Sequence, residues 1–550
     1  MAAAEHVQGQ DMTGWNYAEL WETVAEQIPD APAQIQGQRV ITWGEWNRRA
    51  NGVARALLDA GLGEQAKVAQ YLHNCPEYLE SMFAAFKAGL VPVNTNYRYT
   101  DDELVYLWDN ADTEAVVFHG HFVDNIDRIR DRVPRVKVWL WVDDDTAACP
   151  AWATPYEQAA AAHPGRVEAP WGRSGDHLYM LYTGGTTGMP KGVMWRVDDH
   201  IRNVIALGVN PRYRDDPVDY SVTRELVQQV GMVGLPACPL MHGTGCMTQL
   251  IVLSGGGCVV TLESPNLDIV ELFDTIETNR INTIAIVGDA FAKPMLRALD
   301  AEPDRWDLSS LFLIASSGVM FSEASKSGLI RHLPHAMIVD AFSSSEAIGM
   351  GQSISAAGVD SGTAKFTVGP NTKVFTEDHR EVEPGSGEIG RVAVGGFQPI
   401  GYYKDPDKTA ATFITVDGQR YSIPGDFATV EADGSITLLG RGSVCINTGG
   451  EKVFPEEVEE ALKIHPDVAD AVVVGVPDDR FGEAITAVIQ LEAGVELDAA
   501  GLVASVKEKL ASYKAPKSVL VINTIGRAPN GKVDYKAMRR YAMAELGIEP

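Results

Sequence analysis

Apolar residues recur at helical spacing after Thr42, and short apolar runs alternate with such stretches through the first third of the chain. Thr42 and Glu45 form the pattern of a capping box, the apolar stripe runs from Trp46 to Leu58, and Gly61 follows, so the sequence predicts one helix here. The flanking pattern predicts strands at 67–72, 91–94 and 115–118, and helices at 76–88 and 101–110. Such alternation is typical of parallel α/β sheets covered by helices.

The middle of the chain continues this alternation. The predicted elements are a strand at 177–181, a helix at 266–278, strands at 281–287, 311–315 and 336–342, and a helix at 322–332. In open parallel sheets, ligands bind at the carboxyl ends of the strands. Small polar residues follow two of the predicted strands, at 316–318 and 340–346, so we expect a ligand site at these ends.

Two stretches lack a clear period. Residues 143–175 are rich in Ala, Pro, Gly and Asp and predict a loop-rich surface passage. Residues 210–229 are dense in charge. For this second stretch we favour a solvated excursion over a subunit contact or an active-site lid.

The last third changes character twice. Residues 385–442 predict short β elements with turns, whereas the chain after Arg441 predicts a helix at 451–463 with Pro455 near its start, strands at 469–476 and 484–491, and a helix at 502–512. We therefore predict an N-terminal domain over 1–442 and a C-terminal domain over 443–550. The expected fold class is α/β: a large N-terminal domain of parallel or mixed sheets with a β-rich subdomain, and a small, mobile α+β C-terminal domain.

The composition narrows the choice of partners. The chain has 550 residues, too many for one hydrophobic core, and 45% of them are hydrophobic. A net charge of −28 disfavours binding to nucleic acid or to an anionic membrane surface, although a locally positive site can still take an anionic substrate. The longest apolar run, 250–262, is too short and interrupted to span a bilayer, so we expect no membrane insertion.

Cysteine use and the N-terminus indicate a reducing compartment. The six cysteines form no C-x-x-C pair and match no zinc module, so free thiols are expected. Residues 1–15 lack the basic and apolar segments of a signal peptide. We therefore expect a cytoplasmic protein.

The strongest chemical signal is the stretch Tyr182–Gly192, which reads YTGGTTGMPKG. Glycines let backbone N–H groups approach an anion, hydroxyls add donors, and a lysine adds positive charge. The stretch therefore predicts a polyphosphate cradle, most simply for ATP, with an ordinary mobile turn as the alternative. The residues expected to contact the nucleotide are Thr183, Gly184, Gly185, Thr186, Thr187, Gly188 and Lys191.

Two better-known glycine motifs do not fit this stretch. The P-loop requires Gly-Lys-Ser/Thr, whereas Lys191 follows Pro190 and precedes Gly192. The dinucleotide fingerprint requires a second glycine where Thr186 stands after Gly184.

YTGGTTGMPKG closely resembles the phosphate loop of the adenylate-forming (AMP-binding) family, which includes acyl-CoA synthetases, adenylation domains and luciferases. The resemblance extends through six ordered motifs over nearly the whole chain. It implies that His242, in the string Pro-Leu-Met-His-Gly-Thr-Gly, borders the acyl pocket, although a lone histidine is more often structural. It also implies an adenine-binding segment made of Ser317, Gly318, Asp340, Ala341, Phe342 and Ser345.

Glu346 matches the family's magnesium carboxylate, with Thr183 as the second expected ligand of Mg²⁺. The usual family string is Tyr-Gly-x-Thr-Glu, so Phe342 and Ser345 keep a ring and a hydroxyl while the phenol and the glycine are lost. Asp340 could accept from the exocyclic amine of adenine, and Phe342 could stack on the base.

The remaining motifs lie near the predicted domain boundary and the C-terminus. The resemblance implies that Asp426 accepts from the ribose hydroxyls and that Arg441 serves the ribose or phosphate. Ser443 stands at the hinge position, where the family usually has Asp or Lys. Gly449 and Gly450 would face the thiol channel after rotation of the C-terminal domain.

Lys532, in the string Arg-Ala-Pro-Asn-Gly-Lys, resembles the family's terminal catalytic lysine. The resemblance implies that it binds the substrate carboxylate and the α-phosphate in one domain orientation. As catalytic residues we therefore expect Lys532, His242 and Glu346. The alternative for a lysine on such a glycine turn is a solvent-exposed charge.

The resemblance implies an AMP-forming acyl-CoA synthetase that uses ATP, Mg²⁺ and coenzyme A on a small-molecule carboxylic acid. Within the family, the strings GVMWR, LSSLFLIASS and GRGSVCINTGGEKVFPEEVE favour actinobacterial-type enzymes for bulky lipid acids, including steroid side-chain carboxylates. Medium- or long-chain fatty acids come second and aryl acids third. A non-CoA adenylating or luciferase-like enzyme and a non-catalytic ATP-binding protein are the other classes, and a homodimer stays open.

Overall fold

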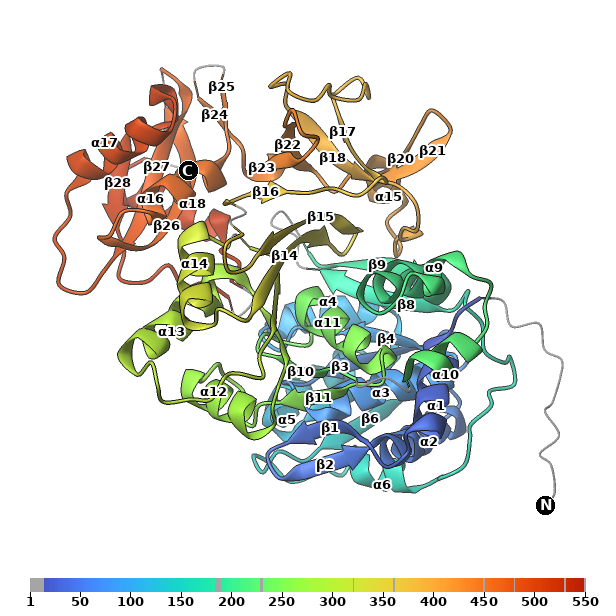
Figure 1. The fold of residues 1–550 in the computed structure, drawn as a ribbon. Coiled ribbons are helices and arrows are strands. Elements are labelled where there is room, and N and C mark those ends of the chain that lie inside the picture. The colour runs from blue at the N-terminus through green and yellow to red at the C-terminus, as the bar shows by residue number, and fades with distance from the viewer. Residues whose placement is uncertain are drawn as a thin grey trace.

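The computed structural model describes residues 14–183, 189–227, 231–319, 321–359, 362–448, 451–478, 480–528 and 531–548, without the side chain of Ser443. Within these residues the strands form four sheets. Figure 1 shows a large body, coloured blue to yellow-green, with an orange β-rich part and a red C-terminal part beside it. The predicted fold class, a large α/β part with a smaller C-terminal part, is confirmed, and the mobility of the C-terminal part stays a prediction.

The first sheet has the strand order β19-β9-β8-β4-β3-β5-β6-β7 and is parallel from β8 to β7, while β9 and β19 are antiparallel. Its alternate side chains enter different cores: Val68 packs on one face, Ala69 and Tyr71 on the other. The strand bounds are β3 (Lys67–Tyr71), β4 (Val91–Asn94), β5 (Thr113–His119), β6 (Val138–Val142), β7 (Thr154–Pro155), β8 (Leu178–Thr183), β9 (Lys191–Arg196) and β19 (Gly401–Tyr402).

The second sheet has the order β15-β14-β13-β12-β10-β11-β1-β2. Its inner pairs are parallel and only the edge pairs β14–β15 and β1–β2 are antiparallel. The strands are β1 (Pro32–Gln36), β2 (Arg39–Thr42), β10 (Val233–Pro236), β11 (Cys258–Thr261), β12 (Thr283–Ile286), β13 (Leu313–Ser317), β14 (Met337–Ser344) and β15 (Ala347–Ser355). Because helices cover both faces, central strands such as β12 are buried along their whole length.

Helices between the two sheets build the largest apolar core. Their rings pack closely: Trp21 lies 5.4 Å from Trp46, and Trp46 lies 4.6 Å from Phe83, between ring centroids. Thr42 caps α2 by accepting from the backbone N–H of Glu45 at 3.2 Å, as the sequence predicts. These helices are α1 (Tyr17–Gln27), α2 (Trp43–Asp59), α3 (Pro76–Lys87) and α11 (Gly243–Ser254).

Other helices cover the outer faces of both sheets, which completes a layered α/β body. On the first sheet these are α4 (Asp101–Asn110), η1 (Gly120–Phe122), α5 (Val123–Ile129) and η2 (Arg130–Arg132). On the second sheet they are α12 (Ile269–Thr278), α13 (Gly288–Ala301) and α14 (Glu323–His332).

The third sheet is antiparallel, with the order β16-β23-β22-β18-β21-β20 and β17 beside β18. Its elements are β16 (Lys365–Phe366), β17 (Thr372–Phe375), β18 (Gly390–Val394), α15 (Pro406–Thr412), β20 (Phe413–Val416), β21 (Gln419–Ser422), β22 (Asp426–Val430) and β23 (Ile436–Arg441). This sheet matches the predicted β-rich subdomain.

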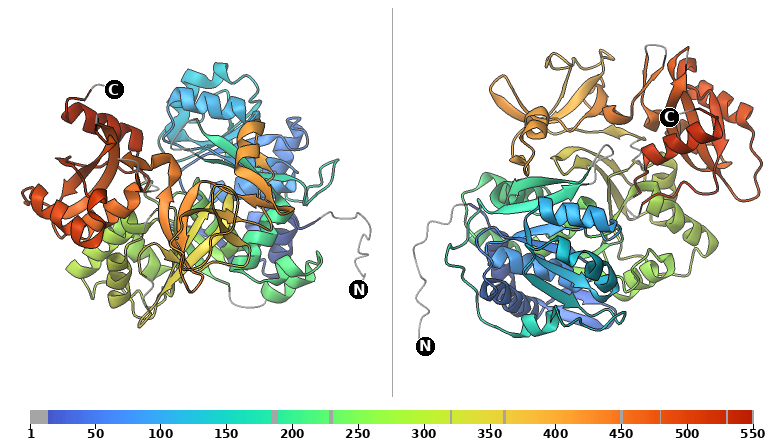
Figure 2. Two further views of the ribbon diagram at one scale, coloured as in Figure 1. Left: turned by 90° about the horizontal axis from the view of Figure 1, so that it is seen from above. Right: turned by 180° about the vertical axis from the view of Figure 1, so that it is seen from behind.

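The C-terminal part builds a fourth sheet, in the order β25-β24-β27-β26 with β28 beside β27. Two apolar clusters within it contain residues from 446 onward only, so it has cores of its own, and Figure 2 shows it beside the main body. Its elements are η4 (Gly442–Val444), β24 (Ile446–Thr448), β25 (Glu451–Val453), α16 (Pro455–Lys463), β26 (Val468–Asp478), β27 (Gly482–Leu491), α17 (Ala499–Lys509), η5 (Ser512–Lys514), β28 (Ser518–Val521) and α18 (Tyr535–Glu545). The predicted boundary after residue 442 remains a prediction that these separate cores support.

Several local predictions differ from the structure. The predicted loop at 143–175 contains β7 and α6 (Tyr156–Ala161), and the helix expected from residue 451 begins at Pro455 because β25 comes first. The charged stretch after residue 210 contains α9 (Arg212–Asp215) and α10 (Ser221–Val227). Tyr213 and Tyr220 are buried there, each with its ring 5.1 Å from that of Trp15, so two aromatic anchors hold a charged segment to the core.

The chain between β9 and this segment is helical but irregular, with α7 (Val197–His200), the π-helix η3 (Ile201–Ile205) and α8 (Ala206–Gly208). Among the described residues, no helix has both the length and the apolarity needed to cross a membrane. All six cysteines lie in described segments and carry free thiols, as predicted.

Candidate active site

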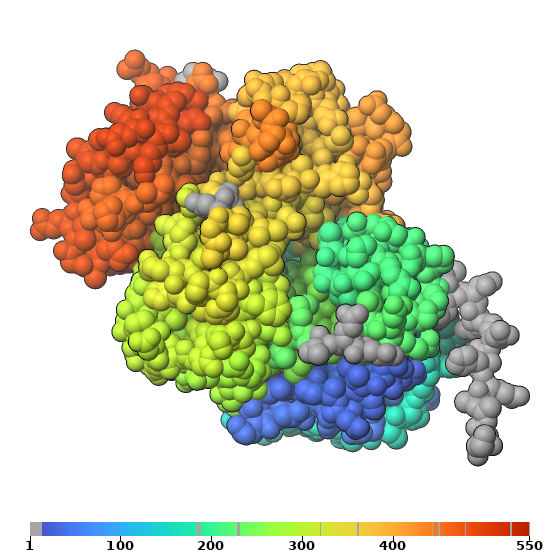
Figure 3. Space-filling view, in the orientation of Figure 1, coloured from blue at the N-terminus to red at the C-terminus, as the bar shows by residue number. Residues whose placement is uncertain are grey.

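A cavity of about 1180 Å³ opens where the second sheet, the third sheet and the C-terminal part meet. Figure 3 shows the surface hollowed between the green and yellow-green segments. The structure brings most of the described site residues predicted from sequence into its wall: Thr183, His242, Ser317, Gly318, Asp340, Ala341, Phe342, Ser345, Glu346, Asp426, Arg441 and Lys532.

The carboxyl ends of β13 and β14 form one wall, as the sequence predicts. Ser316 pairs with Asp340, and Ser317 with Ala341, across the parallel ladder. The buried carboxylate of Asp340 forms an ion pair with Lys326 of α14 at 3.0 Å, while burial raises the pKa of Asp340. One carboxylate oxygen is thus engaged by Lys326, and the predicted contact with adenine would use the other.

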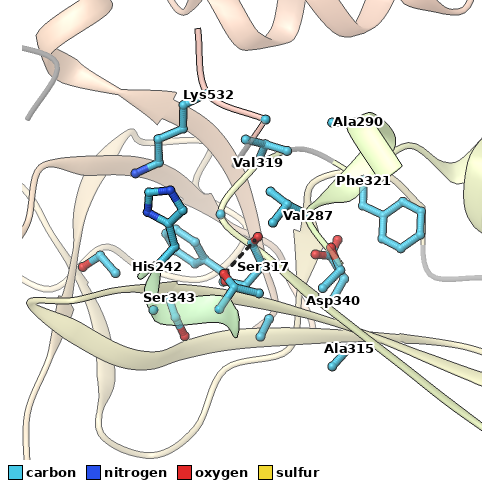
Figure 4. Close-up of a pocket in the computed structure, with 18 of the residues that line it drawn as sticks. His242, Val287, Ala290, Ala315, Ser317, Val319, Phe321, Asp340, Ser343 and Lys532 are labelled. Atoms are coloured by element: carbon cyan, nitrogen blue, oxygen red, sulfur yellow. Dashed lines mark hydrogen bonds between the residues drawn. The ribbon is translucent and has the colours of Figure 1, made fainter. Parts of the chain in front are cut away.

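His242 stands at the N-cap of α11, where the chain turns from a loop into the helix. Burial, together with the positive charges of Lys532 and Arg98, lowers the pKa of His242 to about 3. The imidazole is therefore neutral near pH 7. Figure 4 shows its ring directly below the amino end of Lys532, and Thr244 of the same helix donates to the carbonyl of Ser317 at 3.3 Å.

Asp426 and Arg441 face each other on β22 and β23, with Nε of Arg441 3.2 Å from Oδ1 of Asp426. Burial raises the pKa of Asp426, and the neighbouring Arg441 acts in the opposite direction. Oδ2 of Asp426 is buried and has no hydrogen-bond partner among the described residues. A buried acceptor of this kind fits a hydroxyl donor from a ligand, such as a ribose.

Glu346 lies in the turn between β14 and β15, and its Oε1 accepts from the phenol of Tyr402 at 2.8 Å. Thr183 ends β8 on the same cavity. No group of three or more His, Cys, Asp and Glu side chains gathers as a metal cage in the described residues. One carboxylate and one hydroxyl suit Mg²⁺ that completes its octahedron with phosphate oxygens and water, so the donors fit the predicted ion.

Lys532 reaches the cavity from the C-terminal part, on a turn that starts at Arg527. Arg527 forms two bonds to the carboxylate of Asp470, at 2.6 and 2.9 Å, and a third to the carbonyl of Gly531 at 3.0 Å. Gly531 has φ +70°, and a Cβ at this position would lie 3.1 Å from Val319. The glycine therefore allows the turn to approach the strand-end loop.

The electrostatic environment of Lys532 combines two opposed effects. The side chain of Lys532 is accessible from the cavity. Desolvation by the surrounding protein and the positive charge of Arg441 lower the pKa of Lys532. Glu346 and Asp426 favour its charged form. The cavity wall thus holds two carboxylates beside two cationic side chains.

Other predicted site residues have different surroundings. Lys191 forms an ion pair with Asp405, and the ring of Phe342 packs 5.4 Å from that of Phe366 between centroids. Their predicted contacts with phosphate and adenine remain predictions. The predicted residues that lie outside the described part are Gly184, Gly185, Thr186, Thr187, Gly188, Gly449 and Gly450.

Several contributors carry no local motif. Lys326 forms an ion pair with Asp340, and Tyr402 donates to Glu346, which is 56 residues away in the sequence. The sequence around Lys326 is that of a helix interior, and the sequence around Tyr402 is that of a turn region, so neither stands out as part of a site. No spacing rule in the sequence could have found them.

Besides these polar groups, the cavity has an extensive apolar lining. On β14 the lining runs from Met337 to Ser343, which at about 3.3 Å per residue is roughly 20 Å. α8 and α11 contribute Leu207, Met247 and Ile251 to the same lining. The apolar lining comprises Val204, Leu207, Met232, Met247, Ile251, Val252, Leu313, Met337, Val339 and Ile348.

Sequence comparison decides the family. A model described as AMP-binding enzyme matches residues 21–403, and a model of the AMP-binding enzyme C-terminal domain matches residues 457–532. The chain belongs to the AMP-binding enzyme family. The predicted resemblance is therefore confirmed.

Relatives of this AMP-binding enzyme include a Mycolicibacterium smegmatis protein named medium/long-chain-fatty-acid–CoA/3-oxocholest-4-en-26-oate–CoA ligase, which is 41% identical over 528 residues and 95% of each chain. A Rhodococcus rhodochrous protein named 3-oxocholest-4-en-26-oate–CoA ligase is 40% identical over 542 residues, or 97% of this chain and 96% of the relative. The crystal structure of the anthranilate CoA ligase AuaEII with anthranoyl-AMP has a TM-score of 0.84 at 21% identity, covering 97% and 98% of the two chains, and shares the fold.

Proposed function

We propose that this enzyme is an ATP-dependent, AMP-forming acyl-CoA synthetase that activates a lipid carboxylic acid. The observation that carries the proposal is the position of Lys532, which enters the cavity wall that also holds Asp426, Arg441 and Glu346. Relatives about 40% identical are named as CoA ligases, which supports coenzyme A as the acceptor.

The first half-reaction needs charge stabilisation and alignment. A carboxylate oxygen attacks the α-phosphorus of ATP, an acyl–phosphate bond forms, and pyrophosphate leaves. Lys532 would bind the carboxylate and the α-phosphate, while Asp426 would receive the ribose hydroxyls and Arg441 the ribose or phosphate. Mg²⁺, held by Glu346 and Thr183, would neutralise phosphate charge.

The second half-reaction makes different demands. The thiol of coenzyme A attacks the acyl carbon, and AMP leaves as the thioester forms. This step requires no ammonium at the phosphate, so rotation near Ser443 would withdraw Lys532 and bring the segment at 449–452 to the thiol channel. The separate cores of the C-terminal part support such a rigid-body motion.

The apolar lining of the cavity supports a bulky or long acid as the substrate. A cavity of about 1180 Å³ exceeds the roughly 300–1,000 Å³ typical of small-molecule sites, as a nucleotide plus a lipid would require. A steroid side-chain carboxylate is the preferred substrate class, and a medium- or long-chain fatty acid is the alternative, since relatives carry both names. A cytoplasmic location and a homodimer stay predictions.

Pyrophosphate release tests the function directly. The purified enzyme is supplied with ATP, Mg²⁺ and one acid at a time from steroid, fatty and aryl classes, with and without coenzyme A. We expect release with lipid acids and AMP plus acyl-CoA when the thiol is present. Release without any CoA product, or light or O₂ uptake, would instead favour the non-CoA or luciferase-like alternatives.

Replacement of the lysine tests the division of labour. Lys532→Ala should reduce acyl-AMP formation by at least about a hundredfold, because the carboxylate and the α-phosphate lose the cation that binds both. The rate at which coenzyme A consumes supplied acyl-AMP should stay within a few fold of the wild-type rate. Lys536→Ala, at an exposed position on α18, is the matched control and should retain both steps. Equal loss of both steps in Lys532→Ala would refute the assigned role.

A further inference from the structure

Asn94, the last residue of β4, makes an unusual set of contacts beside the cavity. Its Nδ2 donates to the carbonyl of Tyr182 at 2.9 Å and to the carbonyl of Met241 at 2.7 Å, and its Oδ1 accepts from the backbone N–H of Tyr182 at 2.7 Å. One amide side chain thereby joins two separate segments to the end of β4. Tyr182 precedes Thr183 at the end of β8, and Met241 precedes His242.

These contacts leave little choice of side chain. Both N–H groups of the amide point at carbonyls, and its oxygen accepts from a backbone N–H, so the position requires donors and an acceptor on one planar group. Aspartate has the same shape but would place a carboxylate beside two carbonyl oxygens. Without the amide, the backbone groups of Tyr182 and Met241 would lose these hydrogen bonds, and would be left unsatisfied or would move.

The two segments that Asn94 joins are expected to bind the two different substrates of the adenylation step. The end of β8 leads into the predicted phosphate cradle, while the Met241–His242 segment borders the predicted acyl pocket. We propose that Asn94 is a positioning residue that keeps the nucleotide-binding strand and the acid-binding loop at a fixed separation. The expected effect on catalysis rests on the proposed function. The positioning of the two segments rests on the hydrogen bonds alone.

Asn74 provides a natural comparison within the same protein. Its Nδ2 donates to the carbonyls of Pro236 and Cys238, both at 3.1 Å, and its Oδ1 accepts from the N–H of Leu240 at 2.7 Å. The number and type of bonds equal those of Asn94, and both side chains are half-buried. Asn74, however, holds only the loop before His242, and its side chain forms no hydrogen bond with β8 in the described part of the chain.

The paired variants Asn94→Asp and Asn74→Asp separate positioning from general stability. Steady-state kinetics give KM for ATP and for the acid, and thermal melting gives Tm. We expect Asn94→Asp to raise both KM values about tenfold or more, whereas Asn74→Asp should raise KM for the acid alone, with similar losses of Tm. A change in only one KM for Asn94→Asp, or the same KM pattern in both variants, would overturn the inference.

Amide hydrogen exchange supplies a readout that does not depend on activity. Asn94→Asp should speed exchange both at the end of β8 and at residues 241–247, while Asn74→Asp should affect only the second region. If Asn94→Asp does not fold, Asn94→Ser serves as the milder variant for the same comparison. A wild-type enzyme without pyrophosphate release would refute the proposed function, whereas unchanged exchange at the end of β8 would refute the positioning role of Asn94.

Discussion

Single side chains decide which groups in the cavity are available to a ligand. Oδ2 of Asp426 has no protein partner among the described residues, whereas Oε1 of Glu346 already accepts from Tyr402. The phenol can hold the carboxylate in one rotamer and leave the second oxygen for a cation. We therefore expect Tyr402 to set the geometry of the predicted magnesium ligand.

Tyr402→Phe tests this contact at the scale of one atom. Loss of a hydrogen bond to a charged group costs about 1.5–3 kcal/mol when the group stays buried, so adenylation should slow by roughly tenfold or more and need a higher Mg²⁺ concentration. The measurement is a Mg²⁺ titration of pyrophosphate release.

Tyr403→Phe is the matched control, because the neighbouring phenol donates to Asp112 at 2.7 Å, away from Glu346. It removes the same atom from the adjacent position and should leave the Mg²⁺ dependence unchanged. Equal Mg²⁺ curves for both variants would show that the phenol of Tyr402 does not position Glu346.

At the scale of elements, turns bring the reactive groups to the strand ends. Gly531 allows the turn before α18 to lie against Val319, and Gly318 at φ +100° follows β13 on the other side of the contact. The turn itself is internally bonded, with the N–H of Ala528 donating to the carbonyl of Lys532 at 2.8 Å. The position of the lysine therefore depends on these hydrogen bonds and on a glycine that can approach a loop closely.

Gly531→Ala should obstruct this approach. A Cβ would lie 3.1 Å from Val319, and the positive φ adds about 1–2 kcal/mol of backbone strain. We expect adenylation to fall at least tenfold, measured as acyl-AMP formation in a single turnover, while thioester formation from supplied acyl-AMP changes little.

Gly526→Ala is the control that separates the backbone strain of a positive φ from the steric contact with Val319. This glycine has φ +66° in the same connection, but nothing lies within 4 Å of an added Cβ. It should share the strain and retain adenylation. If both variants lose adenylation equally, strain alone explains the loss and the contact with Val319 is unimportant.

At the scale of the whole molecule, a buried carboxylate lies where the C-terminal part meets the rest. Glu456, on α16, fills the space beside Gly440 of β23 and accepts from the N–H of Arg441 at 3.5 Å. Burial, followed by the negative charges of Glu459 and Asp426, raises the pKa of Glu456 to about 8 from 4.5. The described arrangement of the two parts therefore favours the protonated form.

The sign of the pH effect follows from linkage. Because the folded-state pKa is raised, the stabilising contribution of protonated Glu456 is fully present below pH 4.5 and is lost as the pH rises through about 8. Tm of the wild type should therefore fall more steeply between pH 5 and 8 than Tm of Glu456→Gln, which stays neutral. Parallel Tm curves for the two proteins would contradict this prediction.

Much of the fold and part of the site follow from the sequence alone. The bounds of β4 and α4 match the predicted ranges, because their apolar patterns are bounded by clear stops and caps. β13 is displaced by two residues from its predicted range, since the small residues Ser316 and Ser317 continue the ladder with β14 although they resemble a loop. Tyr213 and Tyr220 show the opposite case, in which two isolated rings bury a segment that its charges suggest is solvated.

The sequence by itself determined the α/β class, the family through its ordered motifs, and many of the polar residues that line the cavity, because periodicity and short motifs are local properties. Only the tertiary structure decided that Tyr402 holds Glu346, that Lys326 pairs with Asp340, and that Asn94 joins two segments 88 and 147 residues away. Such contacts depend on which strand ends lie next to each other in space. Packing between the elements decides this arrangement, and it produces no periodic pattern in the sequence.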